Sequence, residues 1–206
     1  MTPSRRVVLD RIRAALGGAP ADPVAVPRDY DRAPPAGPGD AGRFAEAVCE
    51  YRAQVHRVDG AHIAAAVADL IPRTGPVIIP AGLPPDWVDG VHVVADTVEK
   101  PIPTAELDAA RAVVTGCALG IAATGTIVLD AGPTQGRRAL TLVPDHHICV
   151  VFTDQIVGTV PQAFAALHPR RPLTFISGPS ATSDIELNRV EGVHGPRTLD
   201  VLLVAR

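Results

Sequence analysis

The sequence predicts an α/β fold built on a largely parallel sheet that helices cover on both faces. From residue 54 onward, short apolar runs alternate with segments whose apolar residues follow helical spacing. Strands that are buried on both faces are continuous apolar runs, and such runs are typical of parallel sheets. The 206 residues, 47% of them hydrophobic, are enough to form one substantial core.

The chain is expected to divide near residue 40. Residues 1–40 contain a short amphipathic helix that ends at Gly17 and Gly18, followed by a segment rich in proline. Proline removes backbone donors and fixes the φ angle, so we expect an extended, partly mobile linker over 19–40. Residues 41–206 are expected to form a single domain.

Within that domain the elements follow from apolar spacing and from turn residues. The segment 111–132 holds two apolar runs separated by glycines, with no room between them for a crossover helix. Helices are expected at 41–52, 59–71, 104–109 and 159–168, and further strands at 54–58, 76–82, 91–96, 140–144, 146–152, 173–176 and 198–205.

Composition argues against several classes of partner. The formal net charge is −3 and aromatic residues make up 3% of the chain, so we expect neither nucleic acid nor anionic lipid as a main partner. No apolar run has the length needed to span a bilayer. Cys49, Cys117 and Cys149 form no CxxC pair, which predicts core thiols, no iron–sulfur or zinc site in this chain, and a cytoplasmic location.

The first candidate site is SGPSATSDIE, residues 177–186, directly after a strand that we expect to be buried. In an open α/β sheet, ligands bind beyond the carboxyl ends of strands, and a loop leading into a helix N-terminus presents free amides to an anion. The same residue types also cap a turn or helix, so binding and capping remain equal alternatives. The ligand-binding residues expected here are Gly178, Ser180 and Thr182.

The second candidate is Thr124, Gly125 and Thr126, where two hydroxyls flank a glycine. This arrangement allows a ligand to approach closely between two hydrogen-bonding groups. A tight strand connection whose hydroxyls bond the local backbone is the more common role of such residues.

The third candidate is His194, which Gly195 and the following proline hold in a constrained loop. If Asp184 or Glu186 orients its imidazole, His194 is suited to general acid or base catalysis near neutral pH. A loop histidine that bonds a backbone carbonyl is the alternative.

Two further pairs carry weaker signals. His146 and His147 are adjacent, so on a strand they point to opposite faces and at most one of them lines a given pocket; their spacing does not favour a metal site. Arg137 and Arg138 follow a Gly/Pro loop and either clamp an acidic group or keep a hairpin soluble.

Four ordered blocks, GIAATGTIVLDAG, LVPDHHICVV, SGPSATSDIE and GVHGPRTLDVLLV, resemble the signature blocks of the LUD-domain family. The resemblance covers about residues 104–205. It implies a fold like that of the NagB/RpiA/CoA-transferase group, with a mostly parallel sheet, flanking helices and an antiparallel strand addition. It also implies that the segments 124–126, 177–186 and 194–195 form one pocket for an anionic small molecule.

The resemblance further implies a role in the oxidation of L-lactate to pyruvate, beside partner subunits of which one carries iron–sulfur cysteine motifs. This chain lacks such motifs, so it is expected to be an accessory or substrate-handling subunit with no cofactor of its own. Ala123 stands where the family usually has glutamate, which puts catalysis by this chain alone in question. The alternative is an independent enzyme of the CoA-transferase or sugar-phosphate-isomerase type, with Asp184 or Glu186 as nucleophile or base.

Overall fold

The computed structural model describes residues 3–17, 25–27, 39–71, 75–183, 189–192 and 194–205. The chain forms two compact units, Met1–Arg32 and Ala33–Arg206. The first unit contains helix α1 (Pro3–Ala15), which confirms the helix predicted there. Its large apolar side chains Val7, Val8 and Ile12 are at least half exposed. Most of the predicted linker lies outside the described residues.

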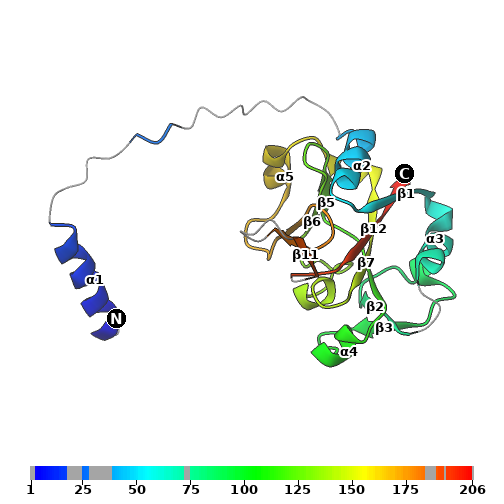
Figure 1. Cartoon of the computed structure of the whole chain (residues 1–206), viewed down its shortest axis with the longest axis horizontal. Helices are drawn as coiled ribbons and strands as arrows, with labels where there is room; N and C mark the ends of the chain where they lie inside the picture. The colour runs from blue at the N-terminus through cyan, green and yellow to red at the C-terminus, as the bar shows by residue number, and fades with distance from the viewer. Residues whose placement is uncertain are drawn as a thin grey trace. The chain divides into compact units, whose positions relative to one another are not determined.

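A six-stranded sheet forms the centre of the second unit, and all of its neighbouring strands are parallel (Figure 1). The strand order is β1-β12-β7-β4-β2-β3. The C-terminal strand therefore lies between the first strand and β7, and its residues are buried along almost its whole length. The strands are β1 (Gln54–Asp59), β2 (Val77–Pro80), β3 (Val93–Asp96), β4 (Ala112–Thr115), β7 (His146–Phe152) and β12 (Thr198–Ala205).

Helices cover both faces of this sheet. Helix α3 buries Ile63 and Val67 against one face, while α2 buries Phe44 and Val48 against the other. Asp40 begins α2, because its carboxylate accepts hydrogen bonds from the backbone amides of the first turn. The α-helices of this unit are α2 (Ala41–Glu50), α3 (Ile63–Leu70), α4 (Thr104–Asp108) and α5 (Val160–Ala166), and the short 3-10 helices are η1 (Gly60–His62), η2 (Pro85–Val88), η3 (Arg138–Thr141) and η4 (Thr153–Gln155).

A smaller four-stranded sheet packs on the α2 side, in the order β8-β5-β6-β9. Two of its pairings, β5 with β6 and β6 with β9, are antiparallel. Helix α5 covers its outer face, on the side of the molecule away from α3 (Figure 1). The predicted fold class, an α/β protein with an antiparallel addition, is confirmed. The strands are β5 (Leu119–Ile121), β6 (Thr126–Leu129), β8 (Ile156–Val157) and β9 (Thr174–Ile176).

The glycine-rich segment 111–132 forms three strands where two runs were predicted. Its first run is interrupted after Thr115, so that β4 belongs to the large sheet and β5 to the small one. The interruption lies at Gly116, whose amide donates a hydrogen bond to the carbonyl of Thr134. Thr134 also packs closely here, because a Cβ at Gly116 would lie 2.8 Å from the Thr134 hydroxyl. The apolar run continues across this change of sheet, so its pattern alone does not reveal the break.

The strand predicted at 140–144 is wrong. Residues 138–141 form η3, in which Leu140 is fully buried and the Thr141 hydroxyl donates to the carbonyl of Arg138. Periodicity does not distinguish a short apolar strand from a single helical turn.

The strand predicted at 173–176 exists, but it is not buried. As β9 it forms one edge of the small sheet, and the side chain of Phe175 is 43% exposed. The expectation of a helix N-terminus after it is also wrong, because β10 (Ala181–Ser183) pairs there with β11 (Arg189–Glu191) in an antiparallel ladder.

The three cysteines are free, and the core-thiol prediction holds for Cys117 and Cys149 but not for Cys49, which is exposed on α2. Among the described residues no helix is long and apolar enough to cross a membrane, and no group of side chains is suited to hold a metal ion.

A buried carboxylate links three neighbouring strands on the α3 side of the large sheet. Asp200 of β12, 2% exposed, accepts hydrogen bonds from His56 of β1 (2.6 Å) and His146 of β7 (2.7 Å). Burial opposes ionisation of Asp200, but the hydrogen bonds from His146 and His56 outweigh it and lower the pKa of the carboxyl below its usual range. Asp200 therefore holds the amino ends of β7 and β12 and the edge strand β1 together.

Candidate functional site

A pocket of about 250 Å³ opens at the amino ends of β7 and β12, on the face opposite Asp200. Its walls come from η3, from the start of these two strands, from β9 with the loop after it, and from the loop before β12. We call it the amino-edge pocket. It is lined by Arg138, Thr141, Leu142, His147, Thr174, Phe175, Ile176, Ser177, Gly178, Pro179, Ser180, His194, Gly195, Pro196 and Leu199.

The pocket does not lie beyond the carboxyl ends of the parallel strands, where the sequence placed it. His147 and Leu199 are the second residues of β7 and β12, so the pocket adjoins the opposite edge of the large sheet. The loop after β9 reaches this edge because β9 belongs to the small sheet and runs antiparallel to β6. The rule for ligand sites in open parallel sheets does not apply to such a strand.

The two C-terminal loops predicted to share a site are held together by hydrogen bonds around Ser180. Its amide donates to the carbonyl of Pro196 (2.7 Å), and its hydroxyl accepts from the amide of His194 (3.0 Å). Gly178, Ser180, His194 and Gly195 consequently line one pocket. The exposed His194 is positioned through its backbone.

The predicted hydroxyls of the glycine turn lie behind the pocket wall. Thr126 shares a hydrogen bond with Ser177, which lines the pocket (2.8 Å), and another with Thr124 (2.7 Å). This chain of hydroxyls ties the turn of the small sheet to the loop that follows β9. Thr124 and Thr126 thus support the lining, although they are not part of it.

Gly125 has no room for any side chain. Its φ angle is +55°, and a Cβ there would lie 2.5 Å from the backbone of Ala47 and Val48 in α2. Gly178 is similar, with φ +139° and a Cβ position 2.7 Å from Tyr51, just after α2. Both glycines allow the site loops to pack against α2.

The remaining predicted site residues are less well placed. Thr182 lies in β10 opposite Val190. Asp184 and Glu186, the predicted catalytic carboxylates, lie outside the described residues. Whether they orient His194 therefore stays a prediction.

The pocket's cationic side chain is Arg138, one of the two arginines for which the sequence left open an anion clamp or a solubilising role. The guanidinium of Arg138 lines the pocket and has no hydrogen-bond or ion-pair partner among the described residues. Its neighbour Arg137 is bound elsewhere, to Asp96. Within the described part of the chain, Arg138 is therefore available to an anion that enters the pocket.

The sequence also gave His147 no role, although it correctly placed His146 and His147 on opposite faces of the strand. The side chain of His147 is 1% exposed, and its Nε2 shares a 2.7 Å hydrogen bond with the hydroxyl of Thr115. The Thr115 hydroxyl also donates to Sγ of Cys149 (3.9 Å), so Thr115 links His147 to this thiol.

His147 lines the amino-edge pocket, although its side chain is only 1% exposed. The pocket thus combines the side chains of Arg138 and His147 and serine hydroxyls with apolar walls.

Behind His147, the pKa values of the Cys117 and Cys149 thiols are shifted in opposite directions. The hydrogen bond from Cys117 lowers the pKa of Cys149 to about 5, helped by His147 and Thr115 and opposed by burial. The same pairing with Cys149, together with burial, raises the pKa of Cys117.

The fold and the pocket place the protein in a class of α/β proteins with a parallel sheet, an antiparallel addition and a small-molecule pocket at the amino edge. The family model of the LUD domain matches residues 41–204, and the chain belongs to this family.

Its similarity extends to individual relatives. It is 50% identical over 167 residues to Lactate utilization protein C of Deinococcus radiodurans, which covers 79% of this chain and 78% of that protein. It is 39% identical to Lactate utilization protein C of Halalkalibacterium halodurans over 84 residues, 36% of that protein. The crystal structure of a duf162 family protein from Deinococcus radiodurans has a TM-score of 0.67 at 42% identity, covering 79% of this chain and 94% of that one.

Proposed function

We propose that the protein acts in lactate utilization in the cytoplasm, as the subunit that holds L-lactate or pyruvate in the amino-edge pocket. The names of its relatives support the pathway. The observation that carries the ligand is Arg138, which lines the pocket beside His147 and has no side-chain partner among the described residues. Partner subunits that carry iron–sulfur clusters perform the oxidation.

The chemistry of the pocket suits a short 2-hydroxy or 2-oxo acid. A guanidinium without a partner binds a carboxylate through charge-assisted hydrogen bonds. The serine hydroxyls of the pocket bond the hydroxyl of lactate, and the apolar side chains of Leu142, Ile176 and Leu199 surround the methyl group. The volume of about 250 Å³ suits a molecule of a few heavy atoms better than a nucleotide or an acyl-CoA.

The substitution Arg138→Gln is expected to weaken binding of L-lactate and pyruvate by about 10- to 100-fold, because charge-assisted hydrogen bonds contribute roughly 1.5–3 kcal/mol. Calorimetric titration of the full chain measures this change. Arg170→Gln is the matched control, since it removes the same charge from an exposed residue that does not line the pocket. Equal affinity in Arg138→Gln and the wild type would contradict the proposed binding mode.

A second experiment separates the proposed function from the alternative enzyme class. A strain that lacks the gene, and has no other lactate oxidase, is expected to grow on L-lactate only when the wild-type gene is restored. Restoration by the Arg138→Gln gene should be impaired. Normal growth of the deletion strain, with thermal stabilisation of the protein by sugar phosphates or acyl-CoAs in place of lactate, would instead favour an independent enzyme.

A further inference from the structure

A second cavity lies at the opposite edge of the large sheet, beyond the carboxyl ends of β2 and β3. It has a volume of about 590 Å³, and part of its lining comes from loop 131–137, which leads to η3. We call it the carboxyl-edge cleft. It is lined by Ala81, Gly82, Asp96, Thr97, Val98, Pro101, Ala131, Gly132, Pro133, Gly136 and Arg137.

The cleft adjoins the point where the strand order reverses. Strands β2 and β4 are neighbours in the large sheet. The chain leaves β2 toward β3 on one side, and it leaves β4 through the small sheet toward β7 on the other side. Connections that leave in opposite directions open a crevice at the carboxyl ends, which is the usual ligand position in open α/β sheets. The carbonyl of Thr134 bonds the amide of Gly116 just after β4, so loop 131–137 forms one wall of this crevice.

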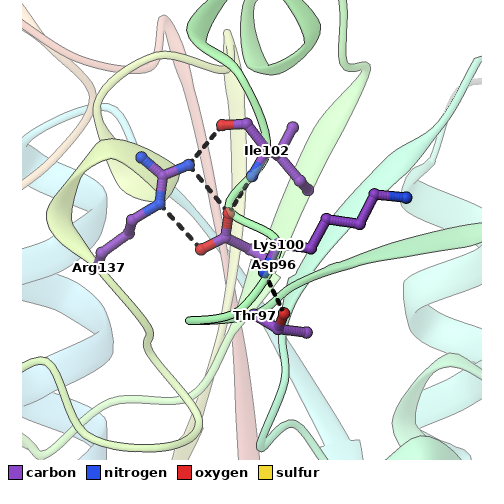
Figure 2. A network of polar contacts seen from close by, with 5 residues as sticks. All are labelled: Asp96, Thr97, Lys100, Ile102 and Arg137. Atoms are coloured by element: carbon purple, nitrogen blue, oxygen red, sulfur yellow. Dashed lines mark hydrogen bonds and ion pairs between the residues drawn. The ribbon is translucent and has the colours of Figure 1, made fainter.

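Arg137 is held rigidly at this cleft by the carboxylate of Asp96 (Figure 2). Its Nε and Nη2 each donate to an Asp96 oxygen at 2.9 Å, and Nη2 also donates to the carbonyl of Ile102 at 2.6 Å. Burial opposes ionisation of Asp96, but the hydrogen bonds from Arg137 and from the amide of Ile102 lower its pKa. Asp96 therefore stays ionised and keeps the guanidinium in one orientation.

The third guanidinium nitrogen, Nη1, remains open. It carries no dashed line in Figure 2 and has no partner among the described residues. The side chain of Arg137 is 39% exposed, whereas that of Asp96 is 6% exposed with both oxygens occupied by donors. The accessible charged group of the cleft is thus a hydrogen-bond donor, which selects an acceptor such as a carboxylate or a phosphate.

The walls around Arg137 are apolar and accessible. Val98 is 94% exposed, and Pro101 and Pro133 are also exposed. A ligand with an apolar body would cover these side chains and remove their surface from water. An inorganic anion would leave them exposed.

We propose that the carboxyl-edge cleft binds a small organic anion, whose carboxylate or phosphate bonds Nη1 of Arg137 and whose apolar part covers Val98, Pro101 and Pro133. The site is independent of the lactate site proposed above. The adjacent arginines divide between the two, with Arg137 at the carboxyl edge and Arg138 at the amino edge.

The test uses the full chain with phenyl phosphate and benzoate as organic probes and inorganic phosphate as the probe without an apolar part. Titrations are followed by amide chemical shifts of residues 81–82 and 97–101. We expect saturable shifts with at least one organic probe, and the stronger of the two identifies the anionic group. Shifts with inorganic phosphate alone, or no shifts with any probe, would overturn the proposal.

Three variants locate the binding. Arg137→Lys keeps a cation beside Asp96 but removes Nη1, and should weaken the organic probe at least about tenfold. Val98→Ser changes an exposed side chain that is not needed for folding, and should weaken the organic probe about two- to threefold without affecting inorganic phosphate. Arg138→Gln should leave the affinity of the carboxyl-edge cleft for the organic probe unchanged. Loss of probe binding in Arg138→Gln, or full binding in both Arg137→Lys and Val98→Ser, would contradict the site.

Discussion

Gly125→Ala is expected to destabilise the folded domain by at least about 3 kcal/mol. The left-handed backbone of Gly125 contributes roughly 1–2 kcal/mol of this for any residue with a Cβ. The larger part is steric, because the new methyl group would lie 2.5 Å from the backbone of Ala47 and Val48. Helix α2 or the turn between β5 and β6 must then move. Chemical denaturation of the two proteins measures the difference.

Gly90→Ala separates the two contributions. Gly90 also has a positive φ angle, +75°, but nothing lies within 4 Å of its Cβ position. Its substitution should therefore reduce stability only by the backbone contribution of about 1–2 kcal/mol. If Gly125→Ala proved as mild as Gly90→Ala, the close packing of the turn on α2 would be disproved.

Asp200→Asn is expected to reduce the free energy of unfolding at pH 7 by about 2–4 kcal/mol. The carboxylate is 2% exposed and each oxygen accepts a hydrogen bond from a different histidine. An amide has one acceptor oxygen, so one of the two imidazole donors loses its partner. Urea denaturation at several pH values measures the effect.

The contribution of Asp200 to stability should depend on pH. The pKa of Asp200 is lower in the folded than in the unfolded protein. Its contribution is therefore complete above the unfolded pKa of about 4 and is lost as the pH falls through the lower folded pKa. The difference between wild type and Asp200→Asn should shrink in that acid range. A difference that stayed constant from pH 7 to pH 2 would contradict the assignment.

Asp145→Asn is the matched control. Asp145 precedes β7, and its 2.9 Å ion pair with Arg197 has side chains that are 64% and 60% exposed. Exposed pairs contribute little, so this variant should change stability by less than about 0.5 kcal/mol. A loss of stability as large as that of Asp200→Asn would show that the effect is not specific to the buried carboxylate.

The fold class was predictable because the local sequence pattern of most strands indicates that they are buried. The runs that became β2, β7 and β12 are mostly apolar, and the structure buries them on both faces. Residues 174–176 carry a similar pattern but form a half-exposed edge, because only long-range pairing decides which strand lies at the edge of a sheet.

The site was predictable only in part, for a related reason. Ser180 and His194 belong to neighbouring loops rich in polar residues and glycine, and these loops do meet. Arg138 and His147 enter the same pocket from a segment that carried only weak signals, an arginine pair and a histidine pair. The alternation of β7 placed His147 opposite His146, but which of the two faces a cavity depends on β4, β9 and β12.

The hairpin of β10 and β11 shows a second limit. Serine, threonine and acidic residues are favoured both at helix N-termini and in short polar strands with turns, so residue type did not choose between them. The pairing of Ala181 with Glu191 spans ten positions, beyond the local signals used for the prediction.

The alternation of β7 and β12 also restricts how the family can change over time. His147 and Leu199 line the pocket, whereas their neighbours His146 and Asp200 form the buried cluster on the opposite face. A substitution alters one face only, but an insertion of one residue within either strand would exchange pocket for core. Relatives should therefore differ by substitutions in β7 and β12 and not by insertions within them.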